Sequence, residues 1–384
     1  MHLFLNGVAA SAGAGLTYLR NVVPELAKRT GVKTTVAVSE SFHREWITLP
    51  NISLVTMQNS AGAVRRFWYE QTHLSGLIRD SGADVLVSTG NFALRTSPVP
   101  QILLSGNSLY TSKDFLGDLR CRGDYRLLLD TKGKGLFAKR SVIWADCAVA
   151  PSEAFAKELS DWTGTHVKTI HHGFDRERFF QDGKPLADEI QRKLDAAQDA
   201  VRLLFVSHYN YYRNFETLFR AIPILQERMG SRPVKLFLTC KLAPEQNPGS
   251  YRTEFANALV RKLKITDSVV ELGAVPYEQL HGLYRSCHIY TTAAYTETFA
   301  HPLVEAMASE LPVVASDLNV HREVCGEAAL YFERFSPKDL AMQVWRMVES
   351  RNISQNFAAK GLARSRDFSW QLHVDQMLAL AGSL

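Results

Sequence analysis

The sequence contains little cysteine. It has five, Cys121, Cys147, Cys240, Cys287 and Cys325, which are widely spaced and include no Cys-x-x-Cys pair. An odd number of scattered cysteines argues against both a disulfide framework and a structural zinc site. We therefore expect a reduced, cytoplasmic protein.

Long apolar runs and dense basic stripes are also missing. No segment approaches the roughly 20 apolar residues that span a bilayer. The first residues, MHLFLNG, lack the basic leader and cleavage site of a signal peptide. Any contact with a membrane is therefore expected to be peripheral, at its inner face. The net charge of +5 is spread along 384 residues, which weakly favours anionic ligands or membrane surfaces and argues against nucleic acid.

Several catalytic motifs are absent as well. The chain has no G-x-S-x-G, Walker loop, H-E-x-x-H or Asp-x-Asp pair. These absences argue against a serine hydrolase, a P-loop NTPase, a zinc protease and a metal-bound nucleotide, so we expect neither a cofactor nor a metal. The loop NGVAASAGAGL contains Gly7, Gly13 and Gly15, where backbone can approach a ligand closely. It does not match the G-x-G-x-x-G dinucleotide fingerprint.

The chain does contain two series of short apolar runs that alternate with longer periodic segments. This alternation predicts repeated βα units and two doubly wound parallel sheets. The expected strands are 2–5, 34–38, 52–57, 84–89, 101–105 and 147–152, then 202–207, 234–239, 268–272, 288–293, 312–316 and 329–332. The polar stretch between His171 and Ala200 predicts the domain seam. A capped amphipathic helix beginning at Ser369 ends the chain.

Two glutamates stand out in the segment YTETFAHPLVEAMASELPVVASD. Because ligands of such sheets bind outside the carboxyl ends of the strands, the loop after strand 288–293 is a candidate binding site. Pro302 is suited to a first helical position, and the amides of 299–304 would face an anion such as phosphate. Glu305, one turn into that helix, would reach a hydroxyl pair such as that of ribose. Alternatively, Glu297 is a solvated loop residue and Glu305 an ordinary first-turn acid.

Cationic residues follow the neighbouring strands. His208 and Arg213 come after strand 202–207, and Lys241 directly follows strand 234–239. A guanidinium and an imidazole near a helix start can neutralise a diphosphate. An exposed arginine without a function is the alternative. For His172, near the seam, a structural role is favoured.

Taken together, these pieces resemble the retaining glycosyltransferases of family 4, which have the two-Rossmann GT-B fold. ETFAHPLVEAMASELPVVASD is similar to the family's signature of two glutamates separated by seven residues and the strand that follows. VELGAVPYEQLHGLYRSCHIY, EVCGEAALYFERFSPKDLA, ADCAVAPSEAFAKEL and TIHHGFDRERF are similar to the flanking segments. The family's usual arginine and lysine fall on His208 and Arg213.

The resemblance implies roles for particular residues. Glu305 would bind the ribose, Glu297 would lie beside the transferred sugar, and Arg213 with His208 would steady the leaving diphosphate. Asn107 takes the place of a donor-contacting histidine, and Ala300 and His301 replace the commoner glycine and an apolar residue. The remaining implied donor-binding residues are Lys241, Phe299, Leu303, Val304, Gly13, Gly15, Gly273 and Val275.

The resemblance also implies two domains facing each other across a cleft. Residues 1–171, with a helix 369–384 that crosses back, would bind the acceptor, and residues 172–368 would bind a UDP-, GDP- or ADP-sugar. The acceptor would be a glycan, a lipid-linked sugar or a small molecule. The basic and apolar region 118–140 would contact an anionic membrane, or is simply an exposed helical pair. An epimerase or phosphorylase of the same fold, and an inactive binding protein, are the alternative functions.

Overall fold

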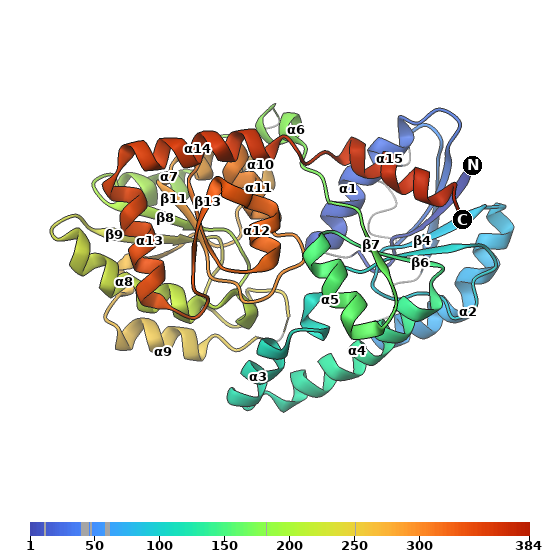
Figure 1. Cartoon of the computed structure of the whole chain (residues 1–384), viewed down its shortest axis with the longest axis horizontal. Helices are drawn as coiled ribbons and strands as arrows, with labels where there is room; N and C mark the ends of the chain where they lie inside the picture. The colour runs from blue at the N-terminus through green and yellow to red at the C-terminus, as the bar shows by residue number, and fades with distance from the viewer. Residues whose placement is uncertain (11–12, 40–45, 47, 58–61, 182, 250) are drawn as a thin grey trace. The chain divides into compact units, whose positions relative to one another are not determined.

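A computed structural model describes residues 1–10, 13–39, 46, 48–57, 62–181, 183–249 and 251–384 (Figure 1). The chain divides into two compact units. Unit 1 comprises Met1–Thr111, Leu128–Gly173 and Ser369–Leu384, and unit 2 comprises Ser112–Leu127 and Phe174–Phe368. The predicted seam at residue 171 lies two residues from this division. The segment Ser112–Leu127, which the sequence assigns to the first domain, makes its contacts within unit 2.

Unit 1 is built on a seven-stranded parallel sheet in the order β3-β2-β1-β4-β5-β6-β7. Its elements are β1 (His2–Asn6), α1 (Gly13–Ala27), β2 (Lys33–Ser39), β3 (Ile52–Met57), α2 (Ala63–Ser81), β4 (Val85–Ser88), β5 (Gln101–Leu104), η2 (Ser108–Tyr110), α4 (Tyr125–Trp144), β6 (Cys147–Ala150), α5 (Glu153–Thr163), β7 (Val167–Thr169) and α15 (Trp370–Ala381). The first residues of α4, up to Leu127, belong to unit 2.

Unit 2 is built on a six-stranded parallel sheet in the order β10-β9-β8-β11-β12-β13. Its elements are α3 (Lys113–Cys121), α6 (Arg176–Gln181), α7 (Asp188–Asp195), β8 (Val201–Phe205), η3 (Tyr211–Arg213), α8 (Phe215–Met229), β9 (Val234–Leu238), α9 (Glu254–Lys262), η4 (Thr266–Ser268), β10 (Val269–Glu271), α10 (Tyr277–Arg285), β11 (Ile289–Thr292), α11 (His301–Ala308), β12 (Val313–Ser316), α12 (Asn319–Cys325), η5 (Gly326–Ala328), β13 (Ala329–Phe332), α13 (Pro337–Glu349) and α14 (Arg351–Ser365).

Both sheets have the doubly wound order that the alternating pattern predicts. Interior strands such as β11 and β12 are buried along their whole length, which explains why their sequences, IYTT and VVAS, contain no charged residue. In register, Leu203 of β8 pairs with Leu236 of β9 on one side and with Ile289 of β11 on the other. The strand β7 is an addition to the prediction. It has only three residues, shorter than the runs by which strands are recognised in sequence.

The terminal helix α15 belongs to unit 1, as predicted. The Ser369 hydroxyl accepts a hydrogen bond from the Leu372 amide and caps the helix. Trp370, Val374 and Met377 enter the core beneath β1 and β2, and α15 lies beside α1 (Figure 1). All five cysteines are free. Within the described residues, no helix combines the length and apolar character needed to cross a membrane.

Candidate active site

The predicted site residues of unit 2 follow neighbouring strands. His208 and Arg213 come after β8, Lys241 after β9, Gly273 and Val275 after β10, and Glu297 after β11. Because all of these strands are parallel and adjacent, their carboxyl ends form one edge of the sheet. The sheet therefore brings the loops that carry these residues to a common edge.

Arg213 lies at the end of η3. The side chain of Asn210 caps this short helix by accepting a hydrogen bond from the Arg213 amide at 3.2 Å. The guanidinium packs 5.1 Å from the centroid of the Tyr212 ring and forms an ion pair with Glu297. Its Nε is buried and has no hydrogen-bond partner. Arg213 is thus a restrained, largely buried cation and not a freely solvated side chain.

Glu297 is largely buried as well. Its side chain is 9% exposed, against 19% for Arg213. One carboxylate oxygen pairs with Arg213, and the other accepts a hydrogen bond from the Thr298 amide at 3.2 Å. The alternative of a solvated loop residue does not describe this side chain. The pair joins the β8 loop to the β11 loop at the sheet edge.

His208 is exposed beside this pair. Desolvation by the surrounding protein and the positive charge of Arg213 both lower its pKa. The imidazole is therefore mainly neutral at pH 7, and it offers hydrogen bonds without a charge. Arg213 is accordingly the stronger of the two predicted anion-binding groups.

Lys241 extends toward β10. Its Nζ donates to the Glu271 carbonyl at 3.3 Å, and Lys193 donates to the same oxygen at 3.1 Å. Gly273 has a φ of 83°, and a Cβ there would lie 3.3 Å from Cε of Lys241. A side chain at Gly273 would therefore be strained and would crowd the lysine. Val275 is half-buried two residues later.

Helix α11 begins one residue earlier than the prediction, at His301, with Pro302 second. Ala300 precedes it in the left-handed conformation, with a φ of 64°. The Leu303 amide is already bonded to the Ala300 carbonyl at 3.0 Å, so this amide of the predicted 299–304 set is occupied within the protein.

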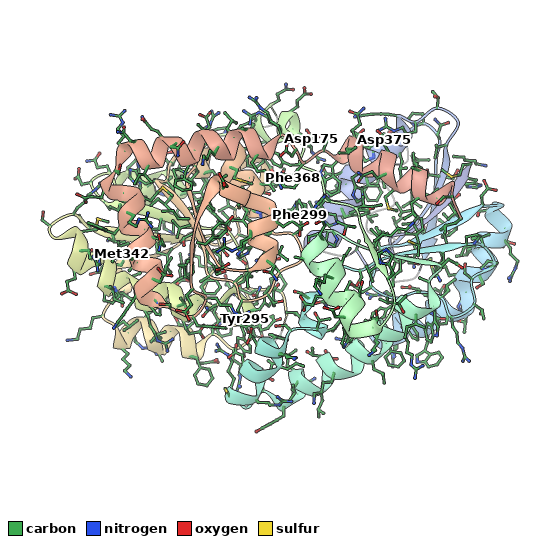
Figure 2. All side chains as sticks on the ribbon, in the orientation of Figure 1. Asp175, Tyr295, Phe299, Met342, Phe368 and Asp375 are labelled. Carbon is green, nitrogen blue, oxygen red and sulfur yellow. The ribbon has the colours of Figure 1, made fainter. Side chains whose placement is uncertain are left out.

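The side chains at the start of α11 serve mainly the core. Phe299, Leu303 and Val304 are buried. The Phe299 ring lies 5.3 Å from that of Phe368, both labelled in Figure 2, and 5.0 Å from the half-buried His301. Any contact of Phe299, Leu303 or Val304 with a ligand must therefore come mainly from their backbone.

Glu305 occupies the second turn of α11 and is 7% exposed. The Tyr284 hydroxyl of α10 donates to its Oε2 at 2.8 Å. Burial nevertheless raises the pKa of Glu305 to about 7, although the hydrogen bond from Tyr284 opposes the shift. A glutamate of the first turn that only faced solvent would be exposed and would keep a pKa near its ordinary value. Glu305 is a buried carboxyl group held in place by a tyrosine.

Sequence reasoning did not single out Tyr284. Its position next to Leu283, and four residues after Leu280, marks the buried face of α10. A buried tyrosine hydroxyl needs a hydrogen-bond partner, and that requirement is the signal that could have linked it to a buried acid.

His321 of α12 was also missed. It is fully buried, with Nδ1 2.8 Å from the Ser316 carbonyl oxygen and Nε2 without a partner. Burial lowers its pKa to about 4, and the charge of Arg213 acts in the same direction. The ring is neutral at pH 7. Nothing in the sequence around it distinguishes it from a surface helix residue.

The predicted residues of unit 1 have local roles. Gly13 and Gly15 fall in the first turn of α1, and a Cβ on Gly15 would lie 3.4 Å from Cα of Ala10. Residues 11 and 12 of the same loop lie outside the described residues. Asn107 caps η2, because its Oδ1 accepts a hydrogen bond from the Leu109 amide at 3.1 Å.

His172 belongs to an aromatic cluster in unit 1. Its ring lies 5.5 Å from Tyr18, 5.4 Å from Trp370 and 5.7 Å from His373. This packing matches the structural role that the sequence favours. Among the described residues, no group of three or more His, Cys, Asp or Glu side chains could hold a metal ion. Independence from metals and cofactors remains a prediction.

Comparison with known proteins gives a consistent result. Residues 187–364 match the family model described as "Glycosyl transferases group 1". A curated relative, D-inositol 3-phosphate glycosyltransferase 2 of Catenulispora acidiphila, is 26% identical over 231 residues, which cover 59% of this chain and 53% of the relative. The chain thus spans about half the length of this curated relative.

Solved structures extend the similarity to the whole chain. Sucrose-phosphate synthase from Thermosynechococcus elongatus has a TM-score of 0.78 at 18% identity, covering 100% of this chain and 98% of that one. Anabaena HepE, solved in complex with UDP-glucose, has a TM-score of 0.73 at 16% identity, covering 100% of both chains. The chain has the GT-B fold of glycosyltransferases, and its second unit resembles the glycosyl transferases of group 1.

Proposed function

We propose that this protein transfers a sugar from a nucleotide-diphosphate sugar to an acceptor hydroxyl, with retention at the anomeric carbon. The observation that carries the proposal is the buried Arg213–Glu297 ion pair, which lies at the same sheet edge as the α11 start. It puts a fixed cation beside a carboxylate where ligands of such sheets bind. The group 1 match supports glycosyl transfer.

The donor would bind to unit 2, within the predicted range 172–368. Glu305 would accept hydrogen bonds from the ribose, because its carboxyl group is held by Tyr284 and lies one turn into α11. Arg213, Lys241 and neutral His208 would bind the diphosphate together with backbone amides at the start of α11. The acceptor would bind to unit 1, within 1–171 and 369–384.

Catalysis would be chiefly electrostatic. As the bond from the anomeric carbon to the phosphate oxygen breaks, negative charge grows on the leaving phosphate, where a restrained cation such as Arg213 is most effective. The acceptor hydroxyl would form the new bond on the same face and pass its proton to the leaving phosphate. Glu297 would lie beside the sugar and stabilise positive charge at the anomeric carbon.

The donor class is a UDP-, GDP- or ADP-sugar. HepE, whose fold this chain shares, was solved with UDP-glucose, which supports a nucleotide sugar without fixing its base. The acceptor is a glycan, a lipid-linked sugar or a small molecule.

A surface of α4 supports a peripheral membrane location. Leu129, Leu136 and Ile143 of unit 1 are 69%, 59% and 47% exposed, and their spacing of seven residues keeps them on one helix face. We call them the α4 stripe. The exposed basic residues Lys132 and Arg140 lie among them in the sequence. Apolar side chains flanked by cations suit the surface of an anionic bilayer, so we place the protein in the cytoplasm at the inner face of the membrane.

A screen of nucleotide sugars, read by released nucleoside diphosphate, tests the proposal. A transferase releases diphosphate with one donor class and far faster when a suitable acceptor is present. Release without any acceptor requirement favours an epimerase or a phosphorylase. Tight nucleotide binding without release from any donor favours an inactive binding protein.

A further inference from the structure

The segment Ser112–Leu127 packs within unit 2, although the chain on both sides of it belongs to unit 1. It contains α3 (Figure 1), which contacts η3. Because η3 ends in Arg213, this segment touches one of the two loops that carry the Arg213–Glu297 ion pair.

Arg122, which follows α3, makes the central contact. Its guanidinium lies 4.3 Å from the centroid of the Tyr211 ring, the first residue of η3. It also bridges Asp118 of α3 and Glu216 of α8, each at 2.7 Å. The three side chains are 13%, 22% and 15% exposed. A planar guanidinium can stack on a ring and bind two carboxylates at once, which a lysine cannot do.

Two further contacts hold η3 from the same segment. The Tyr211 hydroxyl lies 3.3 Å from the Asp124 carboxylate, and the Phe115 ring meets the Tyr212 ring edge-on at 6.2 Å. Both residues before Arg213 in η3 are therefore fixed by side chains of Ser112–Leu127.

The same segment reaches the second loop. The Tyr295 hydroxyl donates to Oδ2 of Asp118 at 2.9 Å, and Tyr295 precedes Glu297 by two residues. The Tyr295 amide also donates to the Tyr212 carbonyl at 3.0 Å, which ties the two loops together. The Asp118 carboxylate thus binds both Arg122, which packs against Tyr211 of η3, and Tyr295, which lies two residues before Glu297.

We propose that Arg122 and Asp118 are positioning residues. They hold the side chains of Arg213 and Glu297 at the positions that sugar transfer requires. The inference rests on the proposed function for its catalytic consequence, since neither residue contacts Arg213 or Glu297 in any described hydrogen bond or ion pair. They act through Tyr211, Tyr212 and Tyr295.

A cavity shows why these contacts matter. A space of about 610 Å³ is lined by Asp114, Asp118 and Arg122 on one side and by Arg220, Phe255 and Lys262 of α8 and α9 on the other. The cavity separates part of this side of α3 from α8 and α9. The contacts of Asp118 and Arg122 with Tyr211, Glu216 and Tyr295, together with the Arg334–Asp114 ion pair, hold it in place.

The first test compares Arg122→Ala with Arg120→Ala, which removes the same charge from an exposed position of α3. Misplacement of the ion pair should lower kcat by about 10- to 100-fold, and KM for the donor should change by a smaller factor, because Glu305 and the start of α11 are untouched. Arg120→Ala should match the wild type. Arg122→Lys should retain part of the activity, and Tyr295→Phe should lower kcat in the same direction while leaving the Arg122 bridges in place.

A double variant separates positioning from general damage. In an Arg213→Ala background one partner of the ion pair is already missing, so adding Arg122→Ala should lower kcat by a clearly smaller factor than it does in the wild type. Multiplicative losses in the double variant, or equal effects of Arg120→Ala and Arg122→Ala, would overturn the proposal.

Hydrogen–deuterium exchange gives a readout that does not need activity. In Arg122→Ala and Tyr295→Phe, amides of 208–214 and 294–299 should exchange faster, while those of β8 and β11 should not change. If the wild type turns over no donor, the proposed function fails, and this exchange pattern still decides the positioning role. Unchanged exchange in both loops of both variants contradicts it.

Discussion

The guanidinium of Arg213 and the carboxylate of Glu297 form an ion pair, although 84 residues separate them in the sequence. The guanidinium of Arg213 is therefore already paired with a carboxylate. In the proposed reaction a diphosphate would compete with Glu297 for the same guanidinium, and it would also meet the negative charge of that carboxylate. The pair would consequently restrain Arg213 and at the same time weaken anion binding.

The first prediction follows from this competition. Glu297→Gln should raise the affinity for nucleoside diphosphate by about threefold to tenfold, because a neutral amide holds the guanidinium less strongly. The same change should lower kcat, since the carboxylate beside the sugar is lost. Calorimetric titration measures the affinity, and Glu349→Gln, an exposed acid of unit 2, is the matched control. Unchanged or weaker binding by Glu297→Gln would show that the pair does not compete with the ligand.

The second prediction concerns the buried Glu305, whose pKa of about 7 lies above its ordinary value of 4.5. A raised folded-state pKa means that this group's contribution to stability is fully present below pH 4.5 and is lost as the pH rises through 7. Relative to Glu305→Gln, the wild type should lose about 3 kcal/mol of unfolding free energy between pH 4.5 and pH 8. Denaturant unfolding of both proteins across this range measures the difference. A constant difference would place the Glu305 pKa near its ordinary value.

The ribose role of Glu305 has a separate test. Ribose hydroxyls that donate to the carboxylate favour its ionised form, so affinity for nucleoside diphosphate should rise as the pH rises through 7. Wild type should bind a nucleoside diphosphate about tenfold more tightly than its 2′,3′-dideoxy analogue at pH 8. Glu305→Gln should discriminate less and should show a flatter pH dependence. Equal discrimination by both proteins argues against hydroxyl binding by Glu305.

The third prediction concerns Ala300, which has a side chain although its backbone is in the left-handed conformation, with a φ of 64°. That conformation costs roughly 1 to 2 kcal/mol for a residue with a side chain, while glycine pays an entropic cost of about 0.5 to 1 kcal/mol. Ala300→Gly should therefore be neutral or stabilise by up to about 1 kcal/mol. The control, Ala306→Gly in the same helix, should destabilise by about 1 kcal/mol or more. Thermal unfolding compares them, and similar losses at both positions would contradict the strain at Ala300.

The fourth prediction concerns the α4 stripe. Leu129→Glu combined with Leu136→Glu should strongly reduce binding to vesicles that contain anionic lipid, because it removes apolar contacts and adds negative charge. Both side chains are exposed, so folding should be preserved. Leu372→Glu, at an exposed position of α15, is the control. Co-sedimentation with anionic and neutral vesicles measures binding, and equal binding by the stripe and control variants would rule out this surface.

Much of the fold could be predicted because the signals are local. Strands such as β11 and β12 are short uncharged runs in parallel sheets, and the cap of α15 depends on Ser369 and an amide three residues away. Both periodic patterns and caps are properties of short segments, so one sequence is enough to recognise them.

The side-chain environment of the site depends on distant residues. Nothing near Glu305 indicates that Tyr284 donates to it, and nothing near Arg122 indicates Glu216, 94 residues away. The sequence also gives no reason for Ser112–Leu127 to pack with unit 2. These relationships arise from tertiary packing, which overrides local pattern, and they determine which predicted residues are paired, buried or neutral.

The proposed reaction is expected to need no metal ion. With no Asp-x-Asp pair in the sequence, we expect Arg213, Lys241 and helix-start amides to neutralise the diphosphate, and activity should survive excess EDTA. Loss of activity in EDTA that magnesium or manganese restores would contradict this part of the account.

The most direct test of the proposed reaction is proton NMR of the first product formed from an α-linked nucleotide sugar, followed from the start of the reaction in excess EDTA. We expect an α-anomeric product signal that grows together with released nucleoside diphosphate. In the proposed reaction the leaving phosphate accepts the proton of the acceptor hydroxyl, so same-face substitution is expected. A β-anomeric first product would contradict retention, and no sugar transfer from any UDP-, GDP- or ADP-sugar would contradict the proposed function.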